Sequence, residues 1–236
     1  MKNRFALILS TALIALLVSA TVPVAAFARQ KVIVIDAGHQ AKGNSKKEPI
    51  GPGSSKKKPK VASGTRGVAT RVPEYKLNLK VALKLRDTLK KRGYKVIMIR
   101  TKNNVNISNA ERSRIANKAH ADLLFRVHAN GSPSAKTKGY LTMVPAKNKW
   151  TKPIVSKSAK AGKAIHKATL KATGARNAGF VSTSNMTGFN WSKAPCVIAE
   201  MGFMSNKAED KKLQTSAYQD KLVKGFANGI DAYFGK

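Results

Sequence analysis

The stretch KVIVIDAGHQ, residues 31–40, predicts a buried strand that ends in a histidine. Its continuous apolar run, Val32 to Ile35, is typical of a strand covered on both faces, as in a parallel sheet flanked by helices. Functional groups of such sheets collect at the carboxyl ends of the strands, where Asp36 and His39 stand in this sequence. We therefore expect His39 to lie in a functional site if other parts of the chain supply its partners.

Strands and helices alternate over the rest of the chain. Further β-type runs are expected at residues 94–100, 121–127, 139–144 and 194–199, with one short strand near Phe180. Apolar spacing predicts one helix that opens at residues 72–74 and stops at Gly93. It predicts three further helices, over residues 106–118, 154–173 and 207–234. Ser108, three residues before Glu111, is a capping-box signature. A helix between two successive strands is typical of the crossover that joins parallel strands. The alternation of strands and helices therefore favours an α/β fold with a parallel sheet.

Size and charge restrict the class of protein. The chain has 236 residues and 42% hydrophobic content, enough for one substantial core, so a single domain is expected. Lys and Arg number 45 against 11 Asp and Glu, and the net charge of +34 indicates a polyanionic environment: nucleic acid, a membrane surface or a wall polymer. Cys196 is the only cysteine, which excludes an internal disulfide and a zinc site with several cysteines.

The N-terminal segment narrows this choice. Lys2 and Arg4 precede an almost wholly apolar run over residues 5–20, and small residues around Ala28 fit a cleavage site. We predict a secretory signal peptide over residues 1–28, with an uncleaved membrane anchor as the alternative because the run is long enough to span a bilayer. In both cases the folded part lies outside the cytoplasm, so the cell envelope and not nucleic acid is the expected partner.

Residues 41–71 are rich in Lys, Gly, Ser and Pro. Such a composition cannot bury a core, and it predicts a long surface-loop insertion. Because the segment directly follows His39, it is either functional or a solvated charged insertion.

Three further residues stand at positions that suit a site. His128 follows the predicted strand 121–127 as His39 follows the first strand, so both imidazoles are expected in one crevice. Glu200 follows the strand 194–199, and Glu74 opens a helix, where the helix dipole alone could explain it. Two imidazoles and one carboxylate with an open fourth position form the usual ligand set of a catalytic zinc, and a carboxylate that does not bind the metal can act on the attacking water.

The remaining histidines and aromatic residues are expected to have structural roles. His166 lies between lysines in a predicted helix and is interpreted as solvated, and His120 as structural. Phe189 and Trp191 are expected to cover the core.

Five motifs stand in order within Lys31 to Phe234, a stretch that is essentially the whole mature chain: IDAGHQ, PEYKLN, RVHANG, GARNAGF and APCVIAEMGFMSN. Together they resemble the motifs of the third family of zinc-dependent N-acetylmuramoyl-L-alanine amidases, which are bacterial peptidoglycan hydrolases. The resemblance implies a single α/β domain with a twisted, mostly parallel central sheet sandwiched by helices, here over residues 29–236.

The resemblance also implies roles for the four candidate residues. His39, Glu74 and His128 match the family's zinc ligands, and Glu200 matches its catalytic glutamate. The implied activity is zinc-dependent hydrolysis of the amide between the lactyl group of N-acetylmuramic acid and L-alanine, with Glu200 as the general base that activates water. The enzyme is expected to be secreted and wall-associated, with peptidoglycan as substrate, a basic surface for anionic wall polymers, and no stable membrane insertion after signal cleavage.

Two departures from the family pattern and two other functions stay open. The long interval between His39 and Glu74 makes Glu48 a rival third ligand, and Arg126 stands where many relatives have a small residue, which bears on substrate preference. A non-catalytic cationic wall-binding protein and a zinc peptidase acting on wall peptides are the alternative functions.

Overall fold

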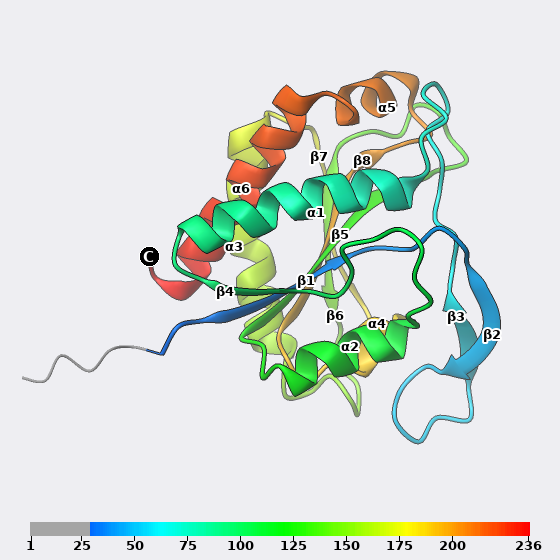
Figure 1. The fold of residues 1–236 in the computed structure, drawn as a ribbon, viewed down its shortest axis with the longest axis vertical. Helices are drawn as coiled ribbons and strands as arrows, with labels where there is room; N and C mark the ends of the chain where they lie inside the picture. Colours follow the sequence, from blue (N-terminus) through cyan, green and yellow to red (C-terminus); the bar gives the residue numbers. More distant parts are fainter. Residues whose placement is uncertain (1–28) are drawn as a thin grey trace, which may run out of the picture.

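β1 (Val32–Ala37) is buried along its whole length and lies inside a six-stranded sheet (Figure 1). The computed structural model describes residues 29–236, so the signal peptide predicted over residues 1–28 lies outside the described part of the chain. The other strands of this sheet are β4 (Lys95–Met98), β5 (Leu123–Asn130), β6 (Tyr140–Pro145), β7 (Asn177–Thr183) and β8 (Cys196–Phe203). The helices are α1 (Glu74–Lys91), α2 (Asn109–Lys118), α3 (Val155–Thr173), α4 (Thr187–Asn190), α5 (Lys207–Leu213) and α6 (Ser216–Phe234).

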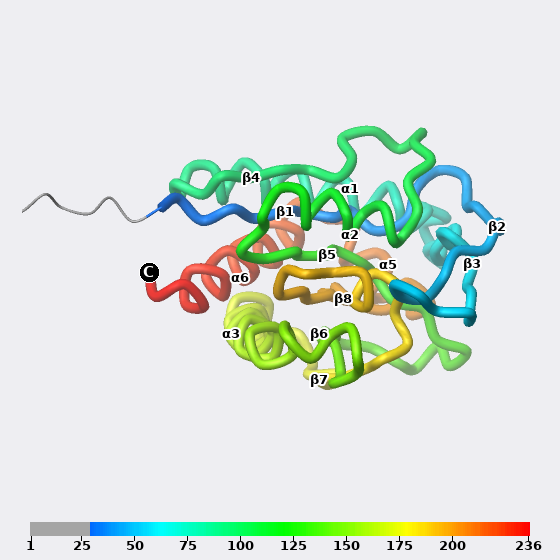
Figure 2. Tube along the Cα trace, turned by 90° about the horizontal axis from the view of Figure 1, so that it is seen from below, coloured from blue at the N-terminus to red at the C-terminus, as the bar shows by residue number. Residues whose placement is uncertain are grey.

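The strands follow one another in the order β4-β1-β5-β8-β6-β7, which Figure 2 shows from one edge of the sheet to the other. Every neighbouring pair is parallel except β6 and β8, which are antiparallel. The predicted mostly parallel sheet is therefore confirmed. β1, β5 and β8 are successive parallel neighbours, so their carboxyl ends lie side by side at one edge of the sheet.

Side chains of the sheet alternate between two layers of helices. Ile33 and Ile35 of β1 belong to a core that includes residues of α1, α3 and α6, whereas Val34 belongs to a second core with α2 and α4. In Figure 1, α1 and α6 lie on one side of the sheet and α2 and α4 on the other. The predicted single α/β domain with helices on both faces is confirmed, and its continuous apolar β1 run is explained by burial from both sides.

Local signals at the helix ends are partly confirmed. The predicted capping box at the start of α2 is present, because the Ser108 side chain accepts from the Glu111 amide and the Glu111 side chain from the Ser108 amide. The single terminal helix expected over residues 207–234 is wrong, since the chain forms α5 and then α6. Gln214 and Thr215 separate them, and Thr215 caps α6 by accepting a hydrogen bond from the Tyr218 amide.

The surface-loop insertion expected over residues 41–71 contains a hairpin. β2 (Asn44–Pro49) and β3 (Lys57–Val61) pair in antiparallel fashion beside the main sheet, at the right of Figure 1. Two tryptophans fasten it to the domain: Trp191 donates to the carbonyl of Pro49 at 2.9 Å, and Trp150 donates to the carbonyl of Pro52 at 2.8 Å. The lysine-rich composition did not predict this hairpin, because the hairpin is stabilised by contacts with aromatic residues far along the chain.

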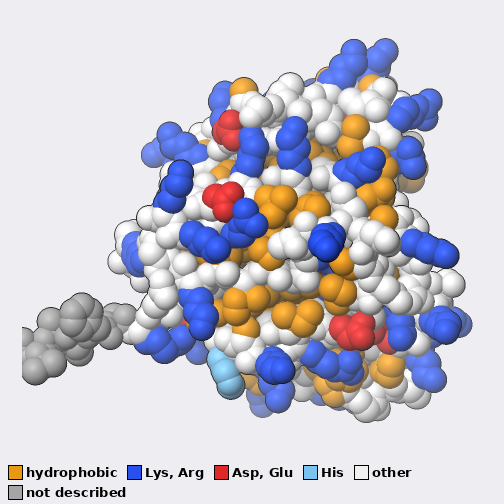
Figure 3. Space-filling model, viewed as in Figure 1, with side chains coloured by type: hydrophobic (Ala, Val, Ile, Leu, Met, Phe, Trp, Pro, Cys, Tyr) orange, Lys and Arg blue, Asp and Glu red, His pale blue; other side chains and the backbone are white. Residues whose placement is uncertain are grey.

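The face of the molecule drawn in Figure 3 is rich in basic side chains. Figure 3 shows Lys and Arg side chains spread over the face seen in Figure 1, with few acidic side chains among them. Within residues 29–236, no helix combines the length and apolar character needed to cross a bilayer.

Candidate active site

His39 lies just beyond the end of β1. Its backbone has a φ of 60°, in the left-handed region that few residues with a side chain adopt. Its Nδ1 lies 2.8 Å from the carbonyl oxygen of Ala62, which orients the ring, and its Nε2 lies 3.2 Å from Glu74 Oε2. Gly64, with a φ of +82°, is needed here because a Cβ atom at that position would lie 2.7 Å from the same carboxylate oxygen.

Glu74 is the first residue of α1 and is buried. Its carboxylate links both histidines, because Oε1 lies 3.1 Å from His128 Nδ1 while Oε2 faces His39. The Thr65 amide donates to Oε2 at 2.9 Å, and Asn78, one turn later in α1, donates to Oε1 at 3.0 Å. The side chain is thus held by hydrogen bonds from several elements and not only by the helix dipole.

His128 and Glu200 come from the neighbouring strands β5 and β8. They are register partners, so their side chains project from the same face of the sheet. Two of their buried atoms, His128 Nε2 and Glu200 Oε2, have no hydrogen-bond partner among the described residues. Gly38 leaves the room for the imidazole, since a Cβ atom there would overlap the His128 ring.

The three residues His39, Glu74 and His128 could hold a metal ion. Each offers one ligand atom, and these atoms lie within 4.8 Å of one another. The donor set of two imidazoles and one carboxylate suits zinc, and the unpartnered Nε2 of His128 indicates a place for a polar ligand. The residues present therefore fit the metal that the resemblance implies.

Burial and mutual contact set the charge of these three side chains. Burial would raise the pKa of Glu74, but its hydrogen bonds with His128 and His39 outweigh burial and hold that pKa well below its ordinary value. Burial lowers the pKa of His128 to about 4, so its imidazole is neutral at pH 7. For His39, burial lowers the pKa, but the hydrogen bond to Glu74 outweighs it and raises the pKa overall.

The pKa of Glu200 is shifted in the opposite direction to that of Glu74. Burial, and then the negative charge of Glu74, raise the pKa of Glu200 to about 8, although the positive charge of Arg126 opposes the shift. A carboxyl with a pKa near neutrality can both accept and donate a proton in one reaction cycle. A cation held by Glu74 would favour the ionised form of Glu200.

Glu48, the rival third ligand, lies elsewhere. It is buried in β2, and its Oε1 accepts a hydrogen bond of 3.0 Å from the Ala110 amide in the first turn of α2. Among the residues that the structure describes, the group able to hold a metal contains Glu74 and not Glu48. Glu48 instead fastens the hairpin to a helix N-terminus, where a carboxylate is favoured.

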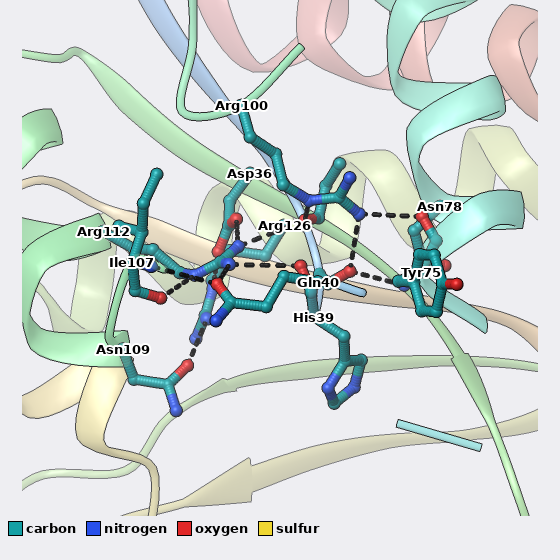
Figure 4. A network of polar contacts seen from close by, with 12 residues as sticks. Asp36, His39, Gln40, Tyr75, Asn78, Arg100, Ile107, Asn109, Arg112 and Arg126 are labelled. Atoms are coloured by element: carbon teal, nitrogen blue, oxygen red, sulfur yellow. Dashed lines mark hydrogen bonds and ion pairs between the residues drawn. The ribbon is translucent and has the colours of Figure 1, made fainter. Parts of the chain in front are cut away.

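A buried ion network supports the end of β1 (Figure 4). Asp36 lies 2.6 Å from Arg112 Nη1 and 2.8 Å from Arg126 Nε. Arg112 also donates to the His39 carbonyl at 3.1 Å, and Arg100 donates to the carbonyls of the two residues before His39. Burial would raise the pKa of Asp36, but the charges of Arg112 and Arg126 outweigh it and keep that pKa well below its ordinary value.

This network includes side chains that the sequence alone does not distinguish. Arg112 and Arg100 are two among 45 basic residues, and they differ from most of the others in being buried, Arg112 against Asp36 and Arg100 against main-chain carbonyls. Arg126, whose departure from the family pattern was expected to bear on substrate preference, is 4% exposed and pairs with Asp36. Its contacts within residues 29–236 give it a supporting role.

The other histidines and aromatic residues have mixed outcomes. His166 is not simply solvated, because its ring nitrogens lie 3.0 Å from Thr142 Oγ1 and 3.1 Å from Asn177 Oδ1. His120 is exposed and has a φ of 47° at the turn after α2. Phe189 is fully buried in the second core, as expected, whereas Trp191 is half-buried and contacts the hairpin.

Comparison with known proteins agrees with this geometry. Residues 33–232 match the family model Amidase_3, described as N-acetylmuramoyl-L-alanine amidase. A putative N-acetylmuramoyl-L-alanine amidase of Buchnera aphidicola subsp. Baizongia pistaciae is 28% identical over 231 residues, which cover 87% of this chain and 97% of the relative. The amidase LytC of Bacillus subtilis is also 28% identical, but the match covers 68% of this chain and 31% of LytC.

Solved structures of N-acetylmuramoyl-L-alanine amidases share this fold. The catalytic domain of CwlV, an N-acetylmuramoyl-L-alanine amidase from Bacillus (Paenibacillus) polymyxa var. colistinus, superimposes with a TM-score of 0.72 at 27% identity, over 87% of this chain and 99% of that domain. Ami1 from Mycobacterium abscessus shares the fold, with a TM-score of 0.79 at 23% identity over 86% of this chain and 98% of Ami1. This chain therefore belongs to the Amidase_3 family of N-acetylmuramoyl-L-alanine amidases and is a hydrolase.

Proposed function

We propose that the enzyme hydrolyses, with zinc, the amide bond between the lactyl group of N-acetylmuramic acid and L-alanine in peptidoglycan stem peptides. The observation that supports this most directly is the meeting of His39, Glu74 and His128 within 4.8 Å of one another, beside a buried carboxylate on the next strand. A metal held by three side chains keeps a position open for water and substrate.

Each residue of the site has a proposed task. His39, Glu74 and His128 would hold zinc, which when bound would activate water and polarise the scissile carbonyl. Glu200, as general base, accepts a proton from the attacking water and then donates it to the nitrogen of the leaving L-alanine. The carbonyl of Ala62 and the amide of Asn78 keep the ligand side chains in their orientation.

We also propose where the enzyme acts. Residues 1–28 serve as a secretory signal peptide and residues 29–236 form the catalytic domain, which is secreted and associated with the cell wall. Its basic surface binds anionic wall polymers, with neither a nucleic-acid partner nor stable membrane insertion. The net charge of +34 and the N-terminal apolar run support this proposal.

Digestion of purified peptidoglycan by the wild type, Glu200→Ala and His128→Ala tests the proposed reaction. We expect the wild type to release peptides with new N-terminal alanine and to leave free lactyl carboxyl groups on the glycan. Glu200→Ala should retain zinc but lose activity, and His128→Ala should lose both. New amino termini other than alanine would indicate a zinc peptidase, and an absence of products with retained wall binding would indicate a non-catalytic wall protein.

A further inference from the structure

We propose that a cavity beside the active site binds a carboxylate of the substrate's peptide through Arg66 and Arg71. The cavity has a volume of about 410 Å³, and Val68, Ser132 and Ser205 also line it. This inference rests on the proposed function, because it assigns the peptide side of the scissile amide to this cavity.

The cavity is built from the same loops that carry the proposed site. Arg66 follows Thr65, whose amide donates to Glu74 Oε2 at 2.9 Å. Ser132 lies just after His128 on the loop that leaves β5, and Ser205 lies just after β8. The cavity therefore lies at the same end of the sheet as the proposed site, on loops that continue directly from it.

Hydrogen bonds between these loops form the cavity before any ligand binds. The Val68 amide donates to the Met204 carbonyl at 3.0 Å, and the Met204 amide donates to the Asn130 carbonyl at 2.8 Å. The Ser132 amide donates to Ser205 Oγ at 3.0 Å. Preorganisation of this kind lowers the cost of ordering the walls on binding.

Asp210 fixes the turn that presents the two arginines. This fully buried carboxylate accepts hydrogen bonds from the Ala69 amide at 2.8 Å and from the amide and hydroxyl of Thr70 at 2.7 Å. Arg66 donates to the main-chain carbonyl of Arg71 at 3.1 Å, which holds its guanidinium close to the second arginine.

The chemistry of the lining selects an anion. Arg66 and Arg71 are exposed, and neither forms an ion pair within residues 29–236. No acidic side chain lines the cavity, while the two serines offer hydroxyl donors. The planar guanidinium fork matches a carboxylate in a bidentate manner. In a substrate whose scissile amide lies in the adjacent proposed active site, the peptide is the part that carries carboxylates.

A pair of substrates tests the inference. Both are soluble N-acetylmuramoyl peptides in which L-alanine precedes an acidic residue, one with its carboxylates free and one with them converted to carboxamides. For Arg66→Gln/Arg71→Gln we expect the KM of the free-carboxylate substrate to rise about tenfold, equivalent to about 1.4 kcal/mol, with the carboxamide substrate unchanged. The matched control Lys56→Gln/Lys57→Gln removes two exposed charges from the hairpin and should leave both KM values unchanged.

Equilibrium binding separates this inference from the proposed reaction. The peptide with free carboxylates and its carboxamide analogue are each titrated into the wild type. The peptide with free carboxylates should bind about tenfold more tightly, and this difference in affinity should be lost in Arg66→Gln/Arg71→Gln. If the wild type cuts neither substrate, the proposed function fails, yet the binding result still decides the cavity's role. Equal affinity for both peptides, or displacement by inorganic phosphate at a similar concentration, would overturn the assignment to a peptide carboxylate.

Discussion

Glu200 is a carboxylic acid in surroundings that disfavour its charge. Because burial and Glu74 raise its pKa to about 8, the folded metal-free protein binds a proton at Glu200 that the unfolded chain releases above pH about 4.5. The stability contributed at this position is therefore present at low pH and lost as the pH rises through about 8. We predict that Glu200→Gln, which cannot ionise, stabilises the chelator-treated protein more at pH 8 than at pH 5.

Urea unfolding of both proteins after chelation measures this difference in the free energy of unfolding. At each pH the variant is compared with the wild type measured at that pH. The contributions of other titrating groups to the free energy of unfolding therefore cancel to first order. A difference that is the same at pH 5 and pH 8 would show that Glu200 does not carry the raised pKa.

Glu74 and Glu48 are both buried carboxylates, but Glu74 opens α1 and contacts the two histidines, whereas Glu48 lies in β2 and accepts from the Ala110 amide. We predict that Glu74→Gln lowers zinc affinity by more than the roughly 10–100-fold that loss of an outer hydrogen-bond partner costs. Glu48→Gln keeps the side-chain size and should leave zinc affinity within about twofold of the wild type, because its acceptor faces α2. Competition with a chromogenic chelator measures both affinities.

Both candidate glutamates could be found in the sequence, but the sequence alone left the choice between Glu74 and Glu48 open. The motif context favours Glu74, while the long interval after His39 leaves Glu48 possible. What decides between them is the path of the hairpin, which carries Glu48 towards Ala110. That path depends on tertiary contacts of tryptophans far along the chain, which local patterns do not contain.

At the scale of elements, Asp36 joins β1 to both α2 and β5 through Arg112 and Arg126. We predict that Asp36→Asn destabilises the fold by about 3–5 kcal/mol at pH 7, because it leaves two buried guanidinium groups without their counter-charge. Urea unfolding measures the loss. Asp220→Asn, which removes an exposed ion pair with Lys84, should unfold close to the wild type.

The same network has a defined pH dependence. Because the folded-state pKa of Asp36 lies below its ordinary value, the stability it contributes is fully present above pH about 4 and is lost as the pH falls further. Acid sensitivity in this range should therefore be weaker in Asp36→Asn than in the wild type. If Asp36→Asn and Asp220→Asn lowered the free energy of unfolding equally at pH 7, the proposed stabilising role of the network would be contradicted.

Elements with a strong local pattern were predictable, and those stabilised from outside were not. The apolar β1 run, the capping box at Ser108 and the apolar spacing of α1 each specify their own structure. β2 and β3 do not, because their exposed lysines carry no strand pattern and Trp150 and Trp191 fasten the hairpin from other parts of the chain. The break between α5 and α6 depends on a single cap residue within a continuous helical pattern.

At the scale of the whole molecule, charge and catalysis are separated. The proposed metal ligands and Glu200 are buried or half-buried, while Lys and Arg are spread over the face drawn in Figure 3 with few acidic neighbours. Exposed charges of one sign attract a polyanion over distances of about 10 Å at 0.1 M salt, whereas buried pairs are screened far less. Salt should therefore weaken attachment to an anionic wall before it alters the site.

We predict that inactive Glu200→Ala binds purified cell walls tightly at low salt and is released as sodium chloride approaches 1 M, where the screening length falls to about 3 Å. Sedimentation of wall fragments with the protein measures the bound fraction, and hydrolysis of a soluble N-acetylmuramoyl peptide by the wild type reports the site over the same salt range. Walls whose carboxyl and phosphate groups have been removed or blocked provide the control and should bind weakly at every salt concentration. Binding that stays constant from low to molar salt would show that the wall is held by specific short-range contacts, and that the +34 charge of the chain does not mediate attachment.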